Sequence, residues 1–420
     1  MNAASIFALA ALALAGCANP KQSPPKDKET TAYVQAPAPQ RATGPVTIDV
    51  TQSYPKRDLY LQDMADVSYI TLETTDESLL HPSPSFIYYV SDSLIVAKTQ
   101  EERVVLFDGK GRFKSSFRRK GQSGKEYIDI IGMAVDTRRR ELFIYDYGTL
   151  YRIQVYDFEG NYKRTLPLPG HVFVSSLQDY SDDCLLVGDE WIHSKKGITG
   201  ISGREKPYFL MSKQTGKVQE ELDIKFHKRV SDSGSLPSAD GMSSMHMTIG
   251  ITPLVRTYDG WVVGDVSMDT LCLYSKGKLS PLLIRTPSVY ATEPPIISFP
   301  TLRTPDYFIF ESLPLEFDFK NPQRGFRTTT LAYDYTQGKV FECNLLNRDL
   351  PAGGSLNFNG TGHIQSPWRN AVFDVIPLEQ LLDARAEGKV NGPLKDIAAQ
   401  LTEESNPVLV VARLKGCPSE

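Results

Sequence analysis

The sequence has no surplus of basic charge, and it has few cysteines and histidines for its length. Lysine and arginine together number 46 against 50 aspartates and glutamates, for a net charge of −4. Without a basic surplus the chain is poorly suited to holding a polyanion, so we expect no nucleic-acid partner. The five cysteines and six histidines include no Cys-x2-Cys or His-x3-His spacing. No zinc site with neighbouring ligands is therefore indicated, and we expect no cofactor.

Long helical periodicity is also missing, from Val46 until a point near Pro377. In its place, short runs of β-branched and aromatic residues alternate with turn residues, a pattern typical of β-strands. The run "RVVLFDGKGRF" (Arg103 to Phe113) matches "RIQVYDFEGNY" (Arg152 to Tyr162), and each predicts a strand, a tight Asp-x-x-Gly turn and a returning strand. Weaker copies place further turn glycines at Gly216, Gly277 and Gly338.

Each copy has another strand-like run about ten residues before its turn, so the repeating unit is a four-stranded antiparallel sheet. One such sheet cannot bury both of its faces alone, whereas sheets packed around a common axis can. We therefore predict an all-β fold, a six-bladed β-propeller over residues 46–420. A β-sandwich is the less favoured alternative, because a sandwich does not repeat one motif at this spacing.

The two ends of the predicted propeller each carry an unpaired strand. The run Val67 to Thr75 has no unit before it, and Pro407 to Lys415 has no hairpin partner after it. Pairing these strands in one blade, with a degenerate sixth unit at Asn357 to Pro377, would close the ring and remove exposed edges. Short helices are predicted near Leu378–Arg385 and Pro393–Leu401, and long loops at Ile192–Lys206 and Phe226–Met247.

The N-terminal segment predicts export and a lipid anchor. The apolar run Ala3 to Ala15 is too short to span a bilayer but suits a signal-peptide core, although no lysine or arginine precedes it. "LAGC" (Leu14 to Cys17) resembles the bacterial lipobox, which implies cleavage before Cys17 and diacylglycerol on its thiol. The alternative is an ordinary signal peptide with an incidental cysteine. We predict a signal peptide at 1–16, and lipidated Cys17 with a disordered proline-rich tether at 17–45.

Several motifs together resemble a known family. "YITLETTDESLL", "FDGKGRF" followed by "KGQSGKEY", and "NPVLVVARLK" are similar to the six-bladed β-propeller lipoproteins of Bacteroidota, which are propellers of NHL or TolB-like type. The usual family form Lys-Gly-x-Gly-Pro-x-Glu-Tyr is altered here, because Ser123-Gly124 replaces Gly-Pro. The resemblance implies the propeller fold and a cell-envelope location as an outer-membrane lipoprotein, on either membrane face. It implies no settled activity.

The stretch "RRKGQSGKEY" (Arg118 to Tyr127) looks at first like a phosphate-binding loop. A P-loop needs Gly-x4-Gly-Lys-Ser/Thr before a helix, but here Gly121 and Gly124 are only three positions apart and the following residues predict a strand. We therefore expect no nucleotide and interpret the stretch as the link between two blades. Glu126 and Tyr127 are candidate ligand-binding residues if they face the axial channel. The alternative is a structural turn with Tyr127 packed between blades.

Thioethers and an imidazole gather in "GMSSMHM". Met242, Met245, His246 and Met247 could together hold Cu(I), which prefers soft ligands. Such a cluster in a methionine-containing loop is more often apolar packing. Four cysteines remain after Cys17, and we expect mostly free, buried thiols rather than disulfides. These are Cys184, Cys272, Cys343 and Cys417.

Acidic residues recur at predicted strand ends, and they leave the question of catalysis open. They are Asp146, Asp189, Glu190, Asp265 and Glu311. Two facing carboxylates could hydrolyse a glycosidic bond, yet an acid at the same place in successive blades is also expected to cap turns. No catalytic residue is assigned. We expect a non-catalytic envelope propeller that binds a protein or glycan, with a carbohydrate-active hydrolase or lyase as the alternative and a metal-handling protein as the third possibility.

Overall fold

The computed structural model describes residues 44–81, 83, 86–146, 148, 151–170, 172–189, 204–226, 228–237, 244–321, 324–351, 358 and 362–417. The predicted signal peptide, Cys17 and nearly all of the predicted tether lie outside these residues. No helix in the described part of the chain is both long enough and apolar enough to cross a bilayer.

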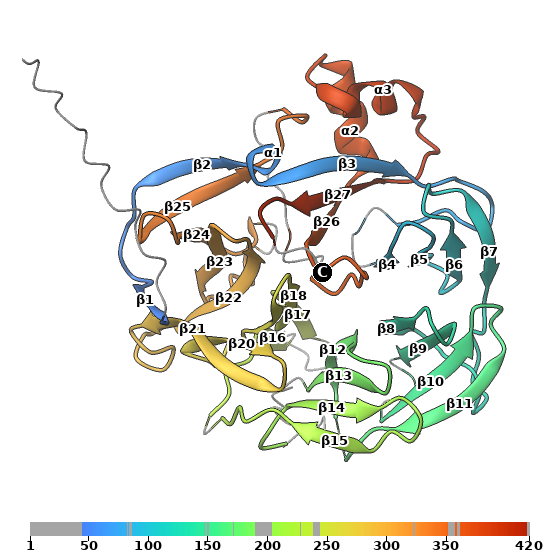
Figure 1. Ribbon diagram of the computed structural model, residues 1–420, viewed down its shortest axis with the longest axis horizontal. Helices are drawn as coiled ribbons and strands as arrows, with labels where there is room; N and C mark the ends of the chain where they lie inside the picture. The colour runs from blue at the N-terminus through green and yellow to red at the C-terminus, as the bar shows by residue number, and fades with distance from the viewer. Residues whose placement is uncertain are drawn as a thin grey trace, which may run out of the picture. The chain divides into compact units, whose positions relative to one another are not determined.

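Six antiparallel sheets stand around a common axis, which confirms the predicted six-bladed propeller (Figure 1). The first three blades are formed by strands in simple sequence order, while the other three each include one strand from the N-terminal part of the chain. The strands of the first three blades are β4 (Ile87–Val90), β5 (Ile95–Lys98), β6 (Val104–Phe107), β7 (Phe113–Phe117); β8 (Ile130–Asp136), β9 (Glu141–Asp146), β10 (Arg152–Asp157), β11 (Tyr162–Pro167); and β12 (Val174–Asp179), β13 (Cys184–Asp189), β14 (Tyr208–Ser212), β15 (Val218–Glu221). Those of the fourth and fifth are β18 (Leu254–Thr257), β19 (Gly260–Val263), β20 (Thr270–Ser275), β21 (Lys278–Thr286); and β22 (Ile296–Arg303), β23 (Tyr307–Pro314), β24 (Thr329–Asp334), β25 (Lys339–Leu346).

The sixth blade closes the ring as predicted. Strand β3 (Ala65–Thr71) pairs antiparallel with β27 (Val408–Leu414), which in turn pairs with β26 (Ala371–Ile376). The expected helices are α2 (Leu378–Ala386) and α3 (Gly392–Gln400), between β26 and β27. A single-turn helix α1 (Leu61–Met64) precedes β3.

Two N-terminal strands extend the outer edges of blades, which the sequence pattern did not predict. Strand β1 (Val46–Asp49) pairs parallel with β21, and β2 (Lys56–Tyr60) pairs parallel with β25. Each covers an outer strand that would otherwise present unpaired backbone groups to solvent. The segment before β3 therefore wraps around two blades (Figure 1).

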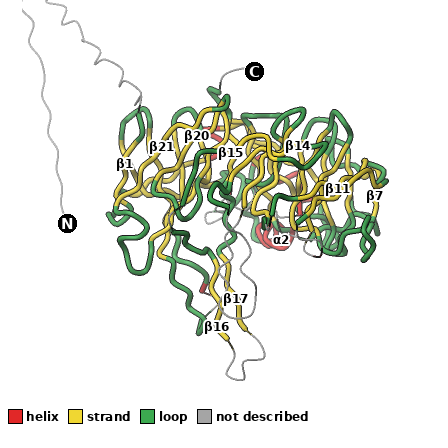
Figure 2. Tube along the Cα trace, turned by 90° about the horizontal axis from the view of Figure 1, so that it is seen from below, coloured by secondary structure: helices red, strands yellow, loops and turns green. Residues whose placement is uncertain are grey.

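The antiparallel order of each blade separates two kinds of connection onto two faces. Links from an outer strand to the next innermost strand, and links between second and third strands, lie on one face, which we call the loop face. Turns between first and second strands, and between third and fourth strands, lie on the other, which we call the turn face. A hairpin of β16 (Ser233–Pro237) and β17 (Ser244–Thr248) projects from the loop face between blades three and four (Figure 2).

The repeated Asp-x-x-Gly motifs form the tight turns of the turn face, as predicted. The Asp108 carboxylate accepts hydrogen bonds from the backbone amides of Lys110 and Arg112, at 2.9 and 3.0 Å. Gly111 has φ of 81°, a left-handed conformation that glycine adopts without strain. The turn glycines of the other four copies also have positive φ.

The axial channel is crossed by residues 362–370, which precede β26 and which we call the channel segment. Gln365 is 2% exposed and connects the innermost strands of three blades. Its side chain accepts from the amides of Val135 and Asp179 at 3.3 and 3.0 Å and donates to the carbonyl of Met133 at 2.7 Å. Its backbone exchanges two further bonds with β4, at 2.9 Å each. This segment takes the place of a regular innermost strand in the sixth blade.

Candidate functional site

Most of the exposed large apolar side chains belong to the connections of the loop face. Seven such residues are between 37% and 57% exposed. Six lie within loop-face links, and Ile131 is the second residue of an innermost strand. They are Leu79, Ile128, Ile131, Tyr151, Leu236, Met245 and Tyr290. No described residue of the turn-face turns belongs to this set, so the exposed apolar surface is distributed on one side of the propeller.

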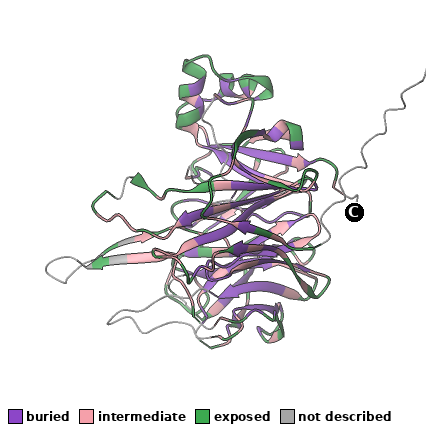
Figure 3. Ribbon diagram, turned by 90° about the vertical axis from the view of Figure 1, so that its left-hand side faces the viewer, coloured by how far each residue is buried: buried purple, intermediate pink, exposed green. Residues whose placement is uncertain are grey.

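The projecting hairpin carries two of these side chains as a cross-strand pair. Leu236 of β16 stands opposite Met245 of β17, and they are 49% and 45% exposed. Closer to the propeller body, Gly234 leaves room for the Phe317 ring, because a Cβ at this glycine would lie 2.8 Å from the ring. Phe317 itself packs edge-on against Phe326 at 5.6 Å. The hairpin is thus anchored at its base and exposes apolar residues further out (Figure 3).

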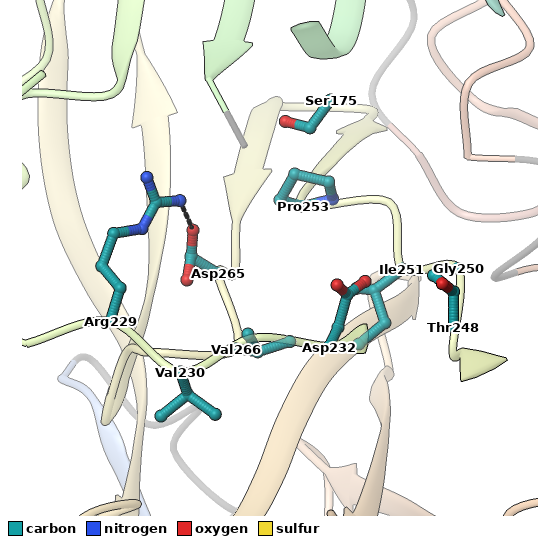
Figure 4. Close-up of a pocket in the computed structure, with 10 residues that line it drawn as sticks. All are labelled: Ser175, Arg229, Val230, Asp232, Thr248, Gly250, Ile251, Pro253, Asp265 and Val266. Carbon is teal, nitrogen blue, oxygen red and sulfur yellow. Dashed lines mark hydrogen bonds and ion pairs between the residues drawn. The ribbon is translucent and has the colours of Figure 1, made fainter. Parts of the chain in front are cut away.

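A small cavity lies at the base of the hairpin, between blades three and four (Figure 4). Its volume is about 130 Å³. Asp265 follows β19, and its Oδ2 accepts bonds from the Tyr208 hydroxyl at 2.9 Å and from Arg229 at 2.8 Å. Its Oδ1 accepts from the Ser267 amide at 2.8 Å. Both oxygens of this carboxylate are therefore already engaged.

Arg229 and Asp232 give the cavity its polar character. The Arg229 side chain is 9% exposed, and its Nε and Nη1 have no hydrogen-bond partner among the described residues. Burial raises the pKa of Asp232, and the nearby negative charge of Asp265 raises that pKa further. The site therefore combines a carboxylate that is paired with an arginine, Asp265, with a second one, Asp232, whose pKa is raised. Its volume, however, is well below the 300–1,000 Å³ of typical small-molecule pockets.

The other acids at second-strand ends act as turn caps. Asp146 accepts from the amides of Ile128 and Gly148 at 3.3 and 2.8 Å, and Asp189 accepts from the amide of Phe173 at 3.1 Å. Each carboxylate thus joins a second strand to the link that enters the same blade. This favours the structural interpretation of the repeated acids. Glu190 lies outside the described residues.

Glu311 differs from these acids. It lies in the middle of β23, and no hydrogen bond to its carboxylate occurs among the described residues. Burial raises its pKa to about 6. It does not line the hairpin-base cavity, so the structure does not bring it together with Asp232 and Asp265.

The link that contains Glu126 and Tyr127 joins β7 to β8, as predicted. Tyr127 is fully buried, donates to the carbonyl of Glu102 at 3.0 Å and accepts from the amide of Arg119 at 3.0 Å. This favours the alternative in which Tyr127 packs between blades. The Glu126 carboxylate accepts from the Ser123 amide at 2.9 Å, within the same turn.

The predicted metal cluster is only partly described. Met242 lies outside the described residues, and so does the side-chain environment of His246. Met245 and Met247 lie on β17 opposite Leu236 and Gly234. No group of three His, Cys, Asp or Glu side chains that could hold a metal ion occurs in the described part of the chain. The Cu(I) site stays a prediction, since this observation does not concern thioethers.

The expectation of free thiols is confirmed for the residues after Cys17, and that of burial holds for two of the four. All four are free, with Cys272 and Cys343 buried and Cys184 and Cys417 partly buried. Burial raises the pKa of Cys272 to about 11 and that of Cys343 to about 12. These thiols therefore stay protonated at neutral pH and are poor nucleophiles.

The residues of the hairpin base were missed from the sequence. Arg229 and Asp232 lie in a link that was expected to be a long loop over Phe226–Met247, and β16–β17 instead forms a hairpin there. A signal was present, because Asp240-Gly241 between two strand-like runs is a typical hairpin turn. Nothing in the sequence showed that Asp265, Arg229 and Asp232 would meet.

Comparisons with known proteins agree with the fold. The chain matches the family described as "Domain of unknown function (DUF4934)" over residues 45–285, and it belongs to that family. None of the curated proteins matches significantly. A crystal structure of a Bacteroides fragilis protein inferred to be exported aligns with a TM-score of 0.57 and 12% identity, over 88% of this chain and 99% of that one. The extracellular domain of an inferred hybrid two-component system of B. thetaiotaomicron aligns with a TM-score of 0.35 and 14% identity, over 66% of this chain and 29% of that one.

Proposed function

We propose that this member of the DUF4934 family is a lipid-anchored β-propeller of the cell envelope that binds an envelope protein through its loop face without catalysis. One observation carries the proposal: six of the seven exposed large apolar side chains belong to loop-face connections, and two of these six project on a hairpin. Exposed apolar surface of this kind is typical of protein-binding sites. A propeller provides a rigid scaffold on which such links are displayed.

The proposed location rests on the N-terminal sequence. The apolar run before Cys17 and the "LAGC" motif support export and lipidation, and the proline-rich residues up to 45 would serve as a tether to the outer membrane. The similar B. fragilis protein is described as exported, which agrees with this location. Mass spectrometry of the purified protein tests it, with an N-terminal diacylglycerol on Cys17 expected and an unmodified Cys17 contradicting it.

The binding proposal is tested by site-specific photo-crosslinking in cells. A photoreactive benzoylphenylalanine replaces Met245 or Tyr290 on the loop face, and Gln337 on the turn face serves as the matched control. We expect one identified envelope protein to be captured from both loop-face positions and not from Gln337. Purified Leu236→Ser/Met245→Ser protein should bind that partner at least tenfold more weakly, and a Cys17→Ala chain should lose the complex in cells. Equal capture from Gln337 would contradict the proposal.

A carbohydrate-active hydrolase is the second candidate, and the raised pKa of Asp232 in the same cavity as the Asp265 carboxylate is the observation in its favour. The small volume of the cavity and the full engagement of Asp265 weigh against it. Release of reducing sugar from envelope glycans, abolished by Asp232→Asn, would support catalysis. Activity that is unchanged in this variant would remove Asp232 from consideration.

A metal-handling role is the third candidate, and Met245 and Met247 on one strand are the observation in its favour. Titration with Cu(I) in the presence of a competing chelator is the test. We expect tight binding only if the thioethers converge, and Met245→Leu/Met247→Leu should then abolish it. Unchanged binding in this variant would place any copper elsewhere.

A further inference from the structure

The β16–β17 hairpin that projects from the loop face has backbone edges outside the blades (Figure 2). Its two strands form a sheet of their own, and the described part of the chain contributes no third strand to it. At the base of this ladder, the amide of Ile249 donates to the carbonyl of Asp232 at 3.1 Å. Bonded and non-bonded pairs alternate in an antiparallel ladder, so every second pair directs its amides and carbonyls outward. The outward-directed pairs are Ser233 with Thr248, Ser235 with His246, and Pro237 with Ser244.

The two edges of the hairpin differ, because that of β16 is blocked and that of β17 is open. On β16, Pro237 has no N–H to donate, and the amide of Ser233 already donates to a nearby serine hydroxyl at 3.2 Å. On β17, the three outward positions Ser244, His246 and Thr248 all carry an N–H and a carbonyl. Thr248 is exposed and borders the hairpin-base cavity, so space is open beside this end of the strand. Another strand can therefore add to β17 and not to β16.

The blades protect their own outer edges with charge. Each blade ends outward in one strand, and all six of these outermost strands contain at least one charged residue. Charged side chains on an edge strand discourage pairing with another chain. These residues include Asp49 of β1, Lys56 of β2, Asp66 of β3, Lys114 of β7, Lys163 of β11 and Glu220 of β15. Strand β17 reads Ser-Met-His-Met-Thr and contains no aspartate, glutamate, lysine, arginine or proline. Its edge thus lacks the residues that keep the other edges unpaired.

The hairpin also has an apolar face that its own chain covers only at the base. Residues directly opposite each other point to the same side of a sheet, so Met247 shares a face with Gly234, and so do Leu236 and Met245. Phe317 lies against Gly234 at the base. Further out, Leu236 and Met245 are 49% and 45% exposed. A ribbon of two strands is marginally stable in water, whereas additional strands that share an apolar face stabilise it.

We infer that β17 pairs antiparallel with β17 of a second copy of this chain, so that two hairpins form one four-stranded sheet. An antiparallel edge is complementary to itself, and a two-fold axis at His246 pairs Ser244 of one copy with Thr248 of the other. The strand has no acidic residue, lysine or arginine, so no such charges repel each other across the axis. The apolar faces of both hairpins lie on the same side of this sheet. The dimer does not rest on the envelope partner proposed above, because it uses the backbone edge and leaves the apolar face open.

Sedimentation velocity of the purified Cys17→Ala chain, which can carry no lipid at that position and needs no detergent, tests this inference. We expect a monomer–dimer equilibrium between about 1 and about 300 µM protein. His246→Pro removes the outward N–H at the centre of β17, where proline is tolerated because that N–H makes no bond within the hairpin. Ser235→Pro is the matched control, because Ser235 stands opposite His246 on the blocked edge. The dissociation constant of the dimer should rise at least about tenfold in His246→Pro and stay within about twofold in Ser235→Pro.

A charge exchange tests whether the added strand comes from the same chain. Position 246 lies opposite itself on the two-fold axis, so His246→Lys and His246→Glu should each raise the dissociation constant about tenfold through repulsion of like charges. An equimolar mixture of these two variants should form a heterodimer that is at least as tight as the parent dimer. Both variants keep the backbone N–H, so they test the pairing without any change to the edge itself.

A monomer at every concentration would overturn the inference. A dimer that His246→Pro and Ser235→Pro weaken equally, or a Lys/Glu mixture that stays monomeric, would overturn it as well. If the chain is monomeric but an envelope protein is captured from Met245 in cells, the dimer fails and the proposed function stands. If the dimer forms and no envelope protein is captured, the proposed function fails and the dimer stands. Unchanged thermal unfolding of the variants confirms that the propeller is intact.

Discussion

The two faces of the propeller are built from the same repeat but differ in length, chemistry and use. The turn face consists of short turns whose aspartates and glycines are required by the backbone, so its shape follows from the fold itself. The loop face consists of longer links, and one of them extends into the β16–β17 hairpin. A link can lengthen without disturbing the sheets, so it can carry residues that the fold itself does not need. Most of the exposed apolar side chains lie in these links. The turn face has cavities between the turns of neighbouring blades, at blades one and two and at blades three and four.

The strongest test of this comparison is the channel segment, which lies between the two faces. Gln365→Ala should lower the free energy of unfolding by about 3–5 kcal/mol, since it leaves the amides of Val135 and Asp179 and the carbonyl of Met133 buried without partners. Urea unfolding followed by tryptophan fluorescence measures this. The control is Gln337→Ala at an exposed turn, which should change stability by less than about 0.5 kcal/mol. Similar values for both variants would mean that the channel segment does not connect the blades.

The turn face offers a matched pair of glycines. A Cβ at Gly111 would lie 2.0 Å from the carbonyl oxygen of Thr71, whereas a Cβ at Gly277 would meet nothing within 4 Å. Both residues have positive φ, 81° and 72°. Gly111→Ala should therefore cost about 3 kcal/mol, from the strained backbone and the clash, and Gly277→Ala only about 1 kcal/mol from the backbone. Equal losses in urea unfolding would show that Thr71 moves aside at no cost.

The sequence predicts the turn face far better than the loop face. Asp108 and Gly111 form a local signal that repeats, so the blades, the closure by β3 and β27, and helices α2 and α3 could all be found from short-range patterns. The hairpin of the loop face interrupts the repeat, and its Asp240-Gly241 signal is easily overlooked inside a long link. Links of this kind follow no period, so their structure has to be found from tertiary contacts.

Contacts between distant residues account for the other differences. Strands β1 and β2 are short and pair in parallel with the edges of blades that are far away in sequence, so no hairpin pattern could indicate them. Gln365 has an ordinary sequence context, and its role arises only because three innermost strands surround it. Chemistry assembled across blades is invisible in any single repeat.

Among the acids, Glu311 sharpens the comparison because it lacks the amide partners of Asp146 and Asp189. Its pKa of about 6 in the folded protein exceeds the ordinary value of 4.5. The folded state therefore keeps the proton between pH 4.5 and 6, and stability falls as pH rises through this range, by about 2 kcal/mol in total. Glu311→Gln cannot ionise and should be more stable than the parent by about 1–2 kcal/mol at pH 7.5, with no gain at pH 4. Urea unfolding at both pH values measures the gain, and a difference independent of pH would refute the assignment.

The smallest expected change in stability belongs to the residues that are proposed to matter most for binding. Leu236 and Met245 are about half exposed in the folded protein, so replacing both by serine removes little buried apolar surface. The free energy of unfolding of Leu236→Ser/Met245→Ser should stay within about 0.5 kcal/mol of the parent. The same variant should nevertheless lose its partner, because the apolar pair would be buried only in the complex. A loss above about 2 kcal/mol in urea unfolding would instead assign the pair to the folded core, and the loop face would then differ from the turn face in length alone.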